Sequence, residues 1–432
     1  MTSDEKMDEG LTTRARLRAI IAGSAGNLVE WYDFYVYAFT ALYFSASFFP
    51  KGDVTAQLLG TSGIFAVGFL MRPLGGWFFG RLADRRGRRH SMMVAILLMA
   101  VGSALIAVVP TYAQVGAAAP VLLLLGRMVQ GFSTGGEYGI AATYLSEIAT
   151  KGRRGFWASF QYVTLIGGQL LALTVILLVQ QFVSDEAMRE WAWRIPFALG
   201  AVAAVAVLAL RRDMPETAPD RNKEAGTMRA LLPHWRAFLI VMGLTAGGSL
   251  FFYVFTTYMQ KYLVNTAAMD AKTANWVMTA VLIPFALMQP AFGALSDRIG
   301  RKANIVIFGV CATLATVPLL TLLGGVTSAG AAFALVLLAL TIASPYTAVS
   351  GLFKAELFPV HVRALGVGLA YGIGNAAFGG TAEYVALSFK QAGNESGFYW
   401  YATAICAVAL ITALLLPDTR RRDPLSDADV AV

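Results

Sequence analysis

The sequence predicts an all-α membrane protein with twelve transmembrane helices in two pseudo-symmetric bundles of six, and three observations carry this prediction. The chain of 432 residues is 57% hydrophobic and only 14% charged. Its apolar residues fall in runs of about 20, the length that an α-helix needs to cross about 30 Å of hydrocarbon. The charged loops between these runs repeat themselves once, half-way along the chain.

Twelve apolar runs define the predicted helices in chain order. They cover residues 19–44, 58–80, 91–110, 119–142, 157–183, 191–210, 236–264, 273–296, 303–325, 329–353, 363–390 and 398–417. The 42 glycines suit helices that approach closely inside a membrane. No small-residue cleavage site follows the first run, so we expect residues 1–18 to be a cytoplasmic tail and not a signal peptide.

The positions of the basic residues predict the orientation. If the N-terminus is cytoplasmic, 26 of the 34 Lys and Arg residues fall in cytoplasmic segments. The positive-inside rule therefore places both termini in the cytoplasm. The net charge of +8 is explained by this topology, and no nucleic-acid partner is needed.

An internal duplication divides the chain. GRLADRRGRRHS (80–91) recurs as GALSDRIGRKAN (293–304), SEIATKGRRG (146–155) answers to AELFPVHVRALG (355–366), and MPET (214–217) answers to LPDT (416–419). We expect six-helix bundles at 19–210 and 236–417, a cytoplasmic linker at 211–235 and a C-terminal tail at 418–432. Two such halves suit a substrate site between them near the bilayer midplane, reached alternately from each side.

The duplicated loops place acids and arginines at the cytoplasmic ends of helices, where ion pairs can latch one conformation. The predicted cytoplasmic gate network is Asp84, Arg88, Glu137, Glu147, Arg154, Asp297, Arg301, Glu356 and Arg363.

These residues carry a family resemblance. The loop G-x-L-A/S-D-R-x-G-R-R/K resembles the signature of the major facilitator superfamily, and the acid–arginine pairs resemble the charge network of its sugar-porter-like branch. NLVEWYDFYVY (27–37), FLMRPLGGWFFGRLADRRGRR (69–89), GRMVQGFSTGGEYG (126–139) and WRIPF (193–197) resemble the metabolite:proton symporter family. The resemblance implies transport across a bacterial inner membrane. Three longer stretches, at 158–173, 256–267 and 378–388, narrow the implied substrate to α-ketoglutarate.

Only four acidic residues, Glu30, Asp33, Glu137 and Glu383, lie inside predicted spans. A charge at the membrane centre costs about 2.5–3.5 kcal/mol or more, so each is a functional candidate. Glu383 has two predicted partners, Lys261 and Lys390.

Two polar stripes follow helical spacing. The first contains Asn27, Glu30, Asp33 and Tyr37, and the second contains Arg127, Gln130, Thr134 and Glu137. Stripes of this kind face the interior of a bundle and not lipid.

Helix direction puts Asp33 and Arg127 at compatible depths, and the sugar-porter-like branch pairs an acid and an arginine on the same two helices. We therefore predict that Asp33 and Arg127 form a direct ion pair and couple the proton, with Glu30 as a second candidate. A substrate carboxylate that takes Arg127 would favour protonation of Asp33, which is symport. The three histidines lie in cytoplasmic segments, so a carboxylate must carry the proton.

Arginine presents two parallel donors to a carboxylate, so Arg72 and Arg127 could clamp a dicarboxylate. The alternative for Arg72 is to tie the Pro73-Gly75-Gly76 bend to the eleventh predicted helix (363–390) or to backbone carbonyl groups. The predicted substrate-binding residues are Arg72, Arg127, Tyr37, Gln161, Gln169, Tyr253, Thr257, Tyr346 and Asn375.

The sequence thus predicts a proton-coupled importer of a small organic anion, and no enzyme, because no metal or nucleophile constellation occurs. Citrate, shikimate or a betaine-type osmolyte remain alternative substrates. A non-transporting metabolite sensor is a further alternative, but the cytoplasmic tails are too short for an output domain. Sugar transport would not need the two arginines. We expect a monomer in the bilayer without cofactor or metal, and no disulfide between Cys311 and Cys406, which both lie in spans.

Overall fold

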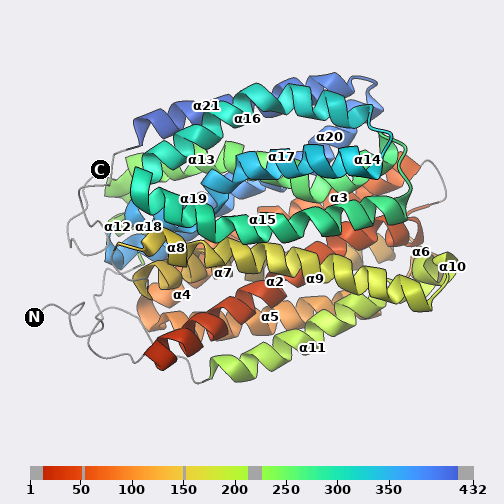
Figure 1. Ribbon diagram of the computed structural model, residues 1–432. Helices are drawn as coiled ribbons and strands as arrows, with labels where there is room; N and C mark the ends of the chain where they lie inside the picture. The colour runs from red at the N-terminus through yellow and green to blue at the C-terminus, as the bar shows by residue number, and fades with distance from the viewer. Residues whose placement is uncertain (1–12, 51–53, 149–151, 213–225, 417–432) are drawn as a thin grey trace, which may run out of the picture.

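The structure is a computed structural model that describes residues 13–50, 54–148, 152–212 and 226–416. Within these ranges the chain is helical and contains no strand. The helices lie roughly side by side, with those of the first half mainly below those of the second half in Figure 1. α2 begins and α21 ends at the same end of the molecule (Figure 1).

The first half contains six helical rods, some of them broken. They are α2 (Thr13–Phe48), α3 with α4 (Val54–Leu70, Arg72–Arg86), α5 (Arg88–Val108), α7 (Ala118–Ile148), α8 with α9 (Arg154–Ala158, Phe160–Phe182) and α11 (Arg194–Arg211). Two short helices, α6 (Tyr112–Val115) and α10 (Asp185–Ala187), lie in the connections.

The second half repeats this plan after the short helix α12 (Met228–Leu231). Its rods are α13 with α14 (Trp235–Tyr253, Met259–Asn265), α15 (Ala271–Ile299), α16 (Arg301–Gly324), α17 with α18 (Ala329–Thr347, Ser350–Glu356), α19 with α20 (Arg363–Gly374, Ala382–Gln391) and α21 (Glu395–Leu415). Each of the twelve predicted runs therefore coincides with one helical rod.

Nine of the described rods are long and apolar enough to cross a membrane by length and composition. The other three rods are α2, α7 and α19 with α20. These three carry the acidic residues that the sequence places inside the membrane, Glu30 and Asp33 on α2, Glu137 on α7 and Glu383 on α20. The departure from a simple apolar helix thus coincides with the candidate functional residues.

Several helical rods are interrupted along their length by a change in the backbone hydrogen-bonding pattern. π-helical segments occupy Val254–Tyr258 between α13 and α14 and Asn375–Gly379 between α19 and α20. A break at Met71 separates α3 from α4, whose first turn contains Pro73. Such irregular turns are common at functional sites, and Arg72, Thr257 and Asn375 all lie in or beside them.

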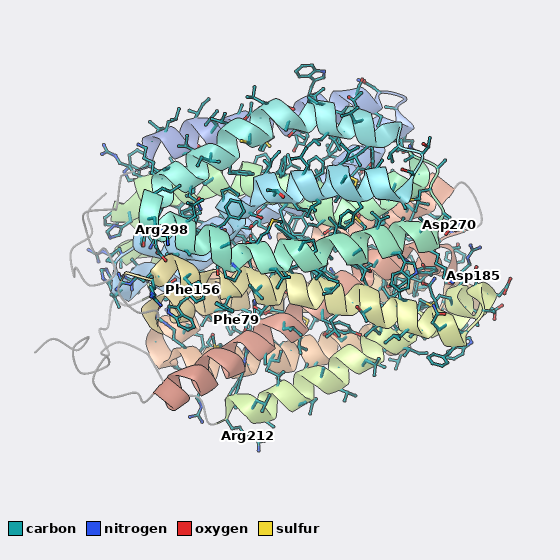
Figure 2. All side chains as sticks on the ribbon, in the orientation of Figure 1. Phe79, Phe156, Asp185, Arg212, Asp270 and Arg298 are labelled. Carbon is teal, nitrogen blue, oxygen red and sulfur yellow. The ribbon has the colours of Figure 1, made fainter. Side chains whose placement is uncertain are left out.

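The duplicated loop has the same backbone conformation in both halves. Gly87 ends α4 with φ 108° and ψ 151°, and Gly300 ends α15 with φ 96° and ψ 156°. These positive φ values favour glycine at both positions. The molecular end that carries these loops also carries Arg298, whereas Asp185 and Asp270 lie at the opposite end (Figure 2).

The two bundles touch through glycines at the loop-bearing end, which we call the inner end. A Cβ atom on Gly76 of α4 would lie 2.7 Å from the carbonyl oxygen of Gly368 on α19. A Cβ atom on Gly293 of α15 would lie 2.4 Å from the carbonyl oxygen of Gly155 on α8. Only glycine permits such close backbone contact, so the inner end is closed in this structure.

Candidate functional site

The inner end is latched by two loop aspartates that each cap a helix of the opposite bundle. Asp84 lies 2.5 Å from Arg88 and accepts a hydrogen bond from the backbone N–H of Leu365 in the first turn of α19 at 3.3 Å. Free backbone N–H groups and the helix dipole both favour a carboxylate at this position.

The second loop makes the equivalent contact in the other direction. Asp297 pairs with Arg301 at 2.9 Å and accepts hydrogen bonds from the backbone N–H groups of Gly155 at 2.8 Å and Phe156 at 3.0 Å, at the start of α8. Arg301 also lies 3.6 Å from Glu356. Five members of the predicted gate network therefore lie in two clusters at the seam between the bundles, Asp84 with Arg88 and Asp297 with Arg301 and Glu356.

The remaining gate residues are placed less uniformly. Arg363 donates from Nε to the carbonyl oxygen of Phe358 at 3.1 Å. The side chain of Glu147, the expected partner of Arg154, lies outside the described residues.

Glu137 differs from the prediction. It forms a buried ion pair with Arg211 of α11, whose Nη1 donates to Oε2 at 3.1 Å, and so it lies within one bundle and away from the gate loops. Arg211 was expected in the cytoplasmic linker, but it is fully buried because α11 continues through it. Glu30 lies near this pair and near Thr134. One carboxylate oxygen of Glu30 has no hydrogen-bond partner.

The predicted direct ion pair between Asp33 and Arg127 is absent from this structure. The two residues are joined instead by a chain of hydrogen bonds through Gln130 and Ser103. Arg127 Nη1 donates to Gln130 Oε1 at 2.6 Å, Gln130 Nε2 donates to Ser103 Oγ at 2.8 Å, and Ser103 Oγ donates to Asp33 Oδ2.

Packing explains why the two charges do not meet. Asp33 turns toward α11, where a Cβ atom on Gly200 would lie 1.8 Å from Asp33 Oδ1. Arg127 turns the other way and places its guanidinium 4.3 Å from the ring centre of Tyr37. The second oxygen of Asp33, Oδ1, is buried without a partner. The sequence analysis did not predict a role for Ser103. The feature that could have indicated it is a pair of small residues, Gly102 and Ser103, in an otherwise apolar helix.

Arg72 is the most exceptional side chain of the site. It is 1% exposed, and within the described part of the chain none of its three guanidinium nitrogens has a hydrogen-bond partner. Its guanidinium carbon lies 3.8, 4.5 and 5.2 Å from the ring centres of Phe69, Phe34 and Trp31. Aromatic faces attract a cation but do not replace a counterion, so a buried guanidinium with unused donors is suited to an anionic ligand. This favours ligand binding over the alternative of a backbone tie.

The second bundle contributes polar groups beside Arg72. The side chain of Tyr253, at the end of α13, lies close to Arg72, Tyr35 and Asn375. Both polar side-chain atoms of Asn375 and the hydroxyl groups of Tyr35 and Thr257 are buried without a hydrogen-bond partner. Unsatisfied buried polar atoms are rare, so several in one place indicate a site for an absent ligand or water.

The other predicted substrate residues are all buried, but their surroundings differ. Tyr37 donates to the carbonyl oxygen of Thr61 at 3.1 Å, and Gln161 donates to that of Tyr138 at 3.4 Å. Gln169 is buried with its amide oxygen and nitrogen unpaired, as is the hydroxyl of Tyr346.

Lys354 is a buried cation that the sequence reasoning missed, because it was assigned to a cytoplasmic segment just beyond the run 329–353. Helix α18 continues to Glu356 and leaves Lys354 fully buried. Its Nζ donates to Ser350 Oγ at 2.7 Å and to the hydroxyl of Tyr138 at 3.1 Å. Tyr138 of α7 stacks on Tyr371 of α19 across the seam, with ring centres 3.5 Å apart.

The opposite end, which we call the outer end, is also closed. Lys261 pairs with Glu383 at 2.8 Å, which confirms one of the two predicted partners, and donates to the carbonyl oxygen of Ala38 in the other bundle at 3.0 Å. Ser62, also in the other bundle, donates to Glu383. Lys390 lies instead 3.5 Å from Glu395. Because both ends are closed, Arg72, Asp33 and Arg127 are shielded from solvent on both sides.

The described residues contain no group of three or more His, Cys, Asp or Glu side chains that could hold a metal ion.

Two family models match the chain, one for each half. The family described as "Sugar (and other) transporter" matches residues 19–228, and the family described as "Major Facilitator Superfamily" matches residues 241–430. The α-ketoglutarate permease of Escherichia coli K12 is 57% identical over 96% of this chain and 97% of that protein. The chain belongs to the major facilitator superfamily.

Other members of the superfamily are more distant. A citrate-proton symporter of Salmonella typhi is 34% identical, covering 92% of this chain and 93% of that protein. The shikimate transporter of Escherichia coli K12 is 32% identical, covering 96% and 98%. A solved structure of a proton:xylose symporter bound to 6-bromo-6-deoxy-D-glucose matches with a TM-score of 0.74 and 17% identity, covering 95% of this chain and 98% of that one, which supports the fold alone.

These findings confirm the predicted fold class and the resemblance to the metabolite:proton symporter family of the superfamily. Its relatives are transporters, so this chain is not an enzyme, and its apolar helices make it an integral protein of the inner membrane.

Proposed function

We propose that this protein is a symporter that imports α-ketoglutarate together with protons by alternating access. The observation that carries the proposal is the buried guanidinium of Arg72, which has no hydrogen-bond partner at the seam between the bundles. The identity of 57% to an α-ketoglutarate permease supports the choice of anion.

Arg72 is the proposed anchor for one substrate carboxylate. Its three nitrogens carry unused donors, and arginine binds carboxylates through two parallel hydrogen bonds. Tyr253 and Asn375 come from the other bundle, Tyr253 lies close to Arg72, and Asn375 lies close to Tyr253. A substrate held by both sides would draw the bundles together, which links binding to closure.

Asp33 is the proposed proton site, with Glu30 as the second candidate. The ionised form of Asp33 is stabilised by a chain of hydrogen bonds that starts at Arg127 and passes through Gln130 and Ser103. Protonation removes a buried negative charge that attracts Arg127, so the positive charge of Arg127 then acts more strongly on an anion. Anion binding and protonation then favour one another, and that reciprocity is what symport requires.

Alternating access follows from two latches that open in turn. We propose that the two bundles rock as bodies joined by the linker that follows Arg211, with both termini cytoplasmic and the protein acting as a monomer in the bilayer. The inner latch is Asp84 and Asp297 on the opposing helix starts, and the outer latch is Glu383 and Lys261 against Ser62 and Ala38.

The alternative substrates are citrate, shikimate and a betaine-type osmolyte, because the more distant relatives include carriers with those names. These relatives are 32–34% identical, against 57% for the α-ketoglutarate permease, so the ketoacid is favoured. A metabolite sensor that does not transport has no observation in its favour.

Uptake of labelled α-ketoglutarate into proteoliposomes tests the proposal. An inward proton gradient should drive accumulation above the outside concentration, and a protonophore should abolish it. Arg72→Ala should remove uptake, whereas Lys390→Ala, at the outer end, should keep it. Accumulation that ignores the proton gradient, or stronger competition by citrate, shikimate or betaine than by unlabelled α-ketoglutarate, would contradict the proposal.

A further inference from the structure

We propose that Lys354 forms a second anion subsite that binds the distal carboxylate of the substrate and so selects dicarboxylates over monocarboxylates. This inference rests on the proposed function and adds the residue that determines specificity within it. Arg72 comes from the first bundle and Lys354 from the second, so a dicarboxylate held at both ends would bridge the two.

The burial and bonding of Lys354 argue for a missing anionic partner. Its side chain is fully buried, and no Asp or Glu lies within ion-pair distance of it among the described residues. A lysine ammonium has three donors, and in the described ranges only Ser350 and Tyr138 accept from it. A buried charge without a counterion is costly and marks a functional position inside a membrane protein.

The groups around Lys354 suit a ligand carboxylate. Four aromatic rings surround the amine, the nearest being Tyr371 with its ring centre 4.4 Å away. The hydroxyl of Tyr346, whose ring centre lies 5.6 Å from the amine, has no hydrogen-bond partner. This hydroxyl is a second donor that a carboxylate beside Lys354 could use.

Tyr371 connects this subsite with Arg72. The ring of Tyr371 is the nearest to Lys354, and its side chain also lies in electrostatic contact with Arg72 and Tyr253. Arg72 and Lys354, neither of which forms an ion pair within the described part of the chain, therefore both border one cluster of tyrosines. This cluster spans the seam, since Tyr371 stacks on Tyr138 of the first bundle.

A purely structural lysine is the competing explanation. In that role Lys354 would only tie α18 to α7 through Tyr138, and its loss would affect every substrate alike. The two explanations differ in how they treat the distal carboxylate, so the experiment compares ligands that differ in this group alone.

The ligands are α-ketoglutarate and 2-oxopentanoate, which lacks the distal carboxylate. Binding to purified protein in detergent is followed by calorimetry for the wild type, Lys354→Met, Lys354→Arg and Lys390→Met. We expect Lys354→Met to weaken α-ketoglutarate binding about tenfold or more, the usual effect of losing a hydrogen bond to a charged group, and to leave 2-oxopentanoate within about threefold. Lys354→Arg should retain most of the preference for the diacid, and Lys390→Met all of it.

Equal losses for both ligands in Lys354→Met, or an unchanged preference, would overturn the subsite. Lys354→Gln, which can still donate to both hydroxyls, replaces the methionine variant if that protein does not fold, and a preference retained in it would also overturn the subsite. Wild-type protein that binds both ligands equally would also overturn the subsite, whereas wild-type protein that does not bind α-ketoglutarate would reject the proposed function itself, so the two failures are distinguishable.

Discussion

Ser62→Ala tests the outer latch, because its hydroxyl crosses between the bundles. Ser62 lies on α3 and donates to Glu383 on α20, and both side chains are buried. The Lys261–Glu383 pair lies within the second bundle, so this substitution removes a cross-bundle contact without separating the ions.

The expected effect follows from the kind of bond that is lost. A hydrogen bond to a charged group contributes about 1.5–3 kcal/mol, so its loss should shift the equilibrium toward the outward-open state by about 10- to 150-fold. Losing the hydrogen bond destabilises the closed state alone, because the two side chains would not be in contact in a state that is open at this end. The hydrogen bond from Lys261 to Ala38 remains and limits the change.

Distances between spin labels at the outer end measure the shift. Glu186→Cys and Lys272→Cys place one label on each bundle, next to Asp185 and near Asp270, which lie at this end (Figure 2), in a background with Cys311 and Cys406 replaced. Ser62→Ala should increase the population at long distances. Ser388→Ala is the matched control, since its hydroxyl bonds only within its own helix. Identical distance distributions in Ser62→Ala and wild type would refute the latch.

Three further predictions concern the proton path and the inner end. Asp33→Asn should abolish proton-driven accumulation and retain exchange of internal for external substrate, as measured by counterflow; accumulation that persists would move the proton site to Glu30. Gln130→Leu should break the link between Arg127 and Asp33 and weaken the response of uptake to the proton gradient, while substrate binding measured by calorimetry changes less than about tenfold; a normal gradient response would exclude the relay. Gly76→Val should prevent closure at the inner end and stop transport, because its side chain meets backbone of the other bundle at 2.7 Å; normal transport kinetics in this variant would show that the contact is dispensable.

The helices were predictable because bilayer thickness fixes their length. All twelve runs coincide with helical rods, and the errors lie at their ends, where membrane proteins extend helices into water. Those errors had consequences for the site. Lys354 and Arg211 were assigned to cytoplasmic segments by the positive-inside rule, but each belongs to the last turns of a longer helix and is buried.

The site was predictable by residue type but not by contact. Arg72 was predicted because a charged residue inside a membrane span is costly and therefore usually functional. The structure places it among aromatic rings, without an ion pair in the described part of the chain. The contact between Asp33 and Arg127 was not predictable, because helical spacing fixes the face and depth of a residue but not its rotamer. The intervening hydroxyl of Ser103 and the glycine at 200 decide that contact, and neither carries a charge that sequence reasoning would notice.

The inner latch has a consequence for mutational scanning. Its hydrogen-bond acceptors are side-chain carboxylates, whereas its donors are the backbone N–H groups of Leu365, Gly155 and Phe156. Every residue except proline supplies such a group, so a scan should report a sharp loss at Asp297 and broad tolerance at Phe156. Gly155 should be intolerant for a different reason, since any larger residue there would strike the backbone of Gly293. Half of this latch is therefore invisible to methods that look for pairs of interacting side chains.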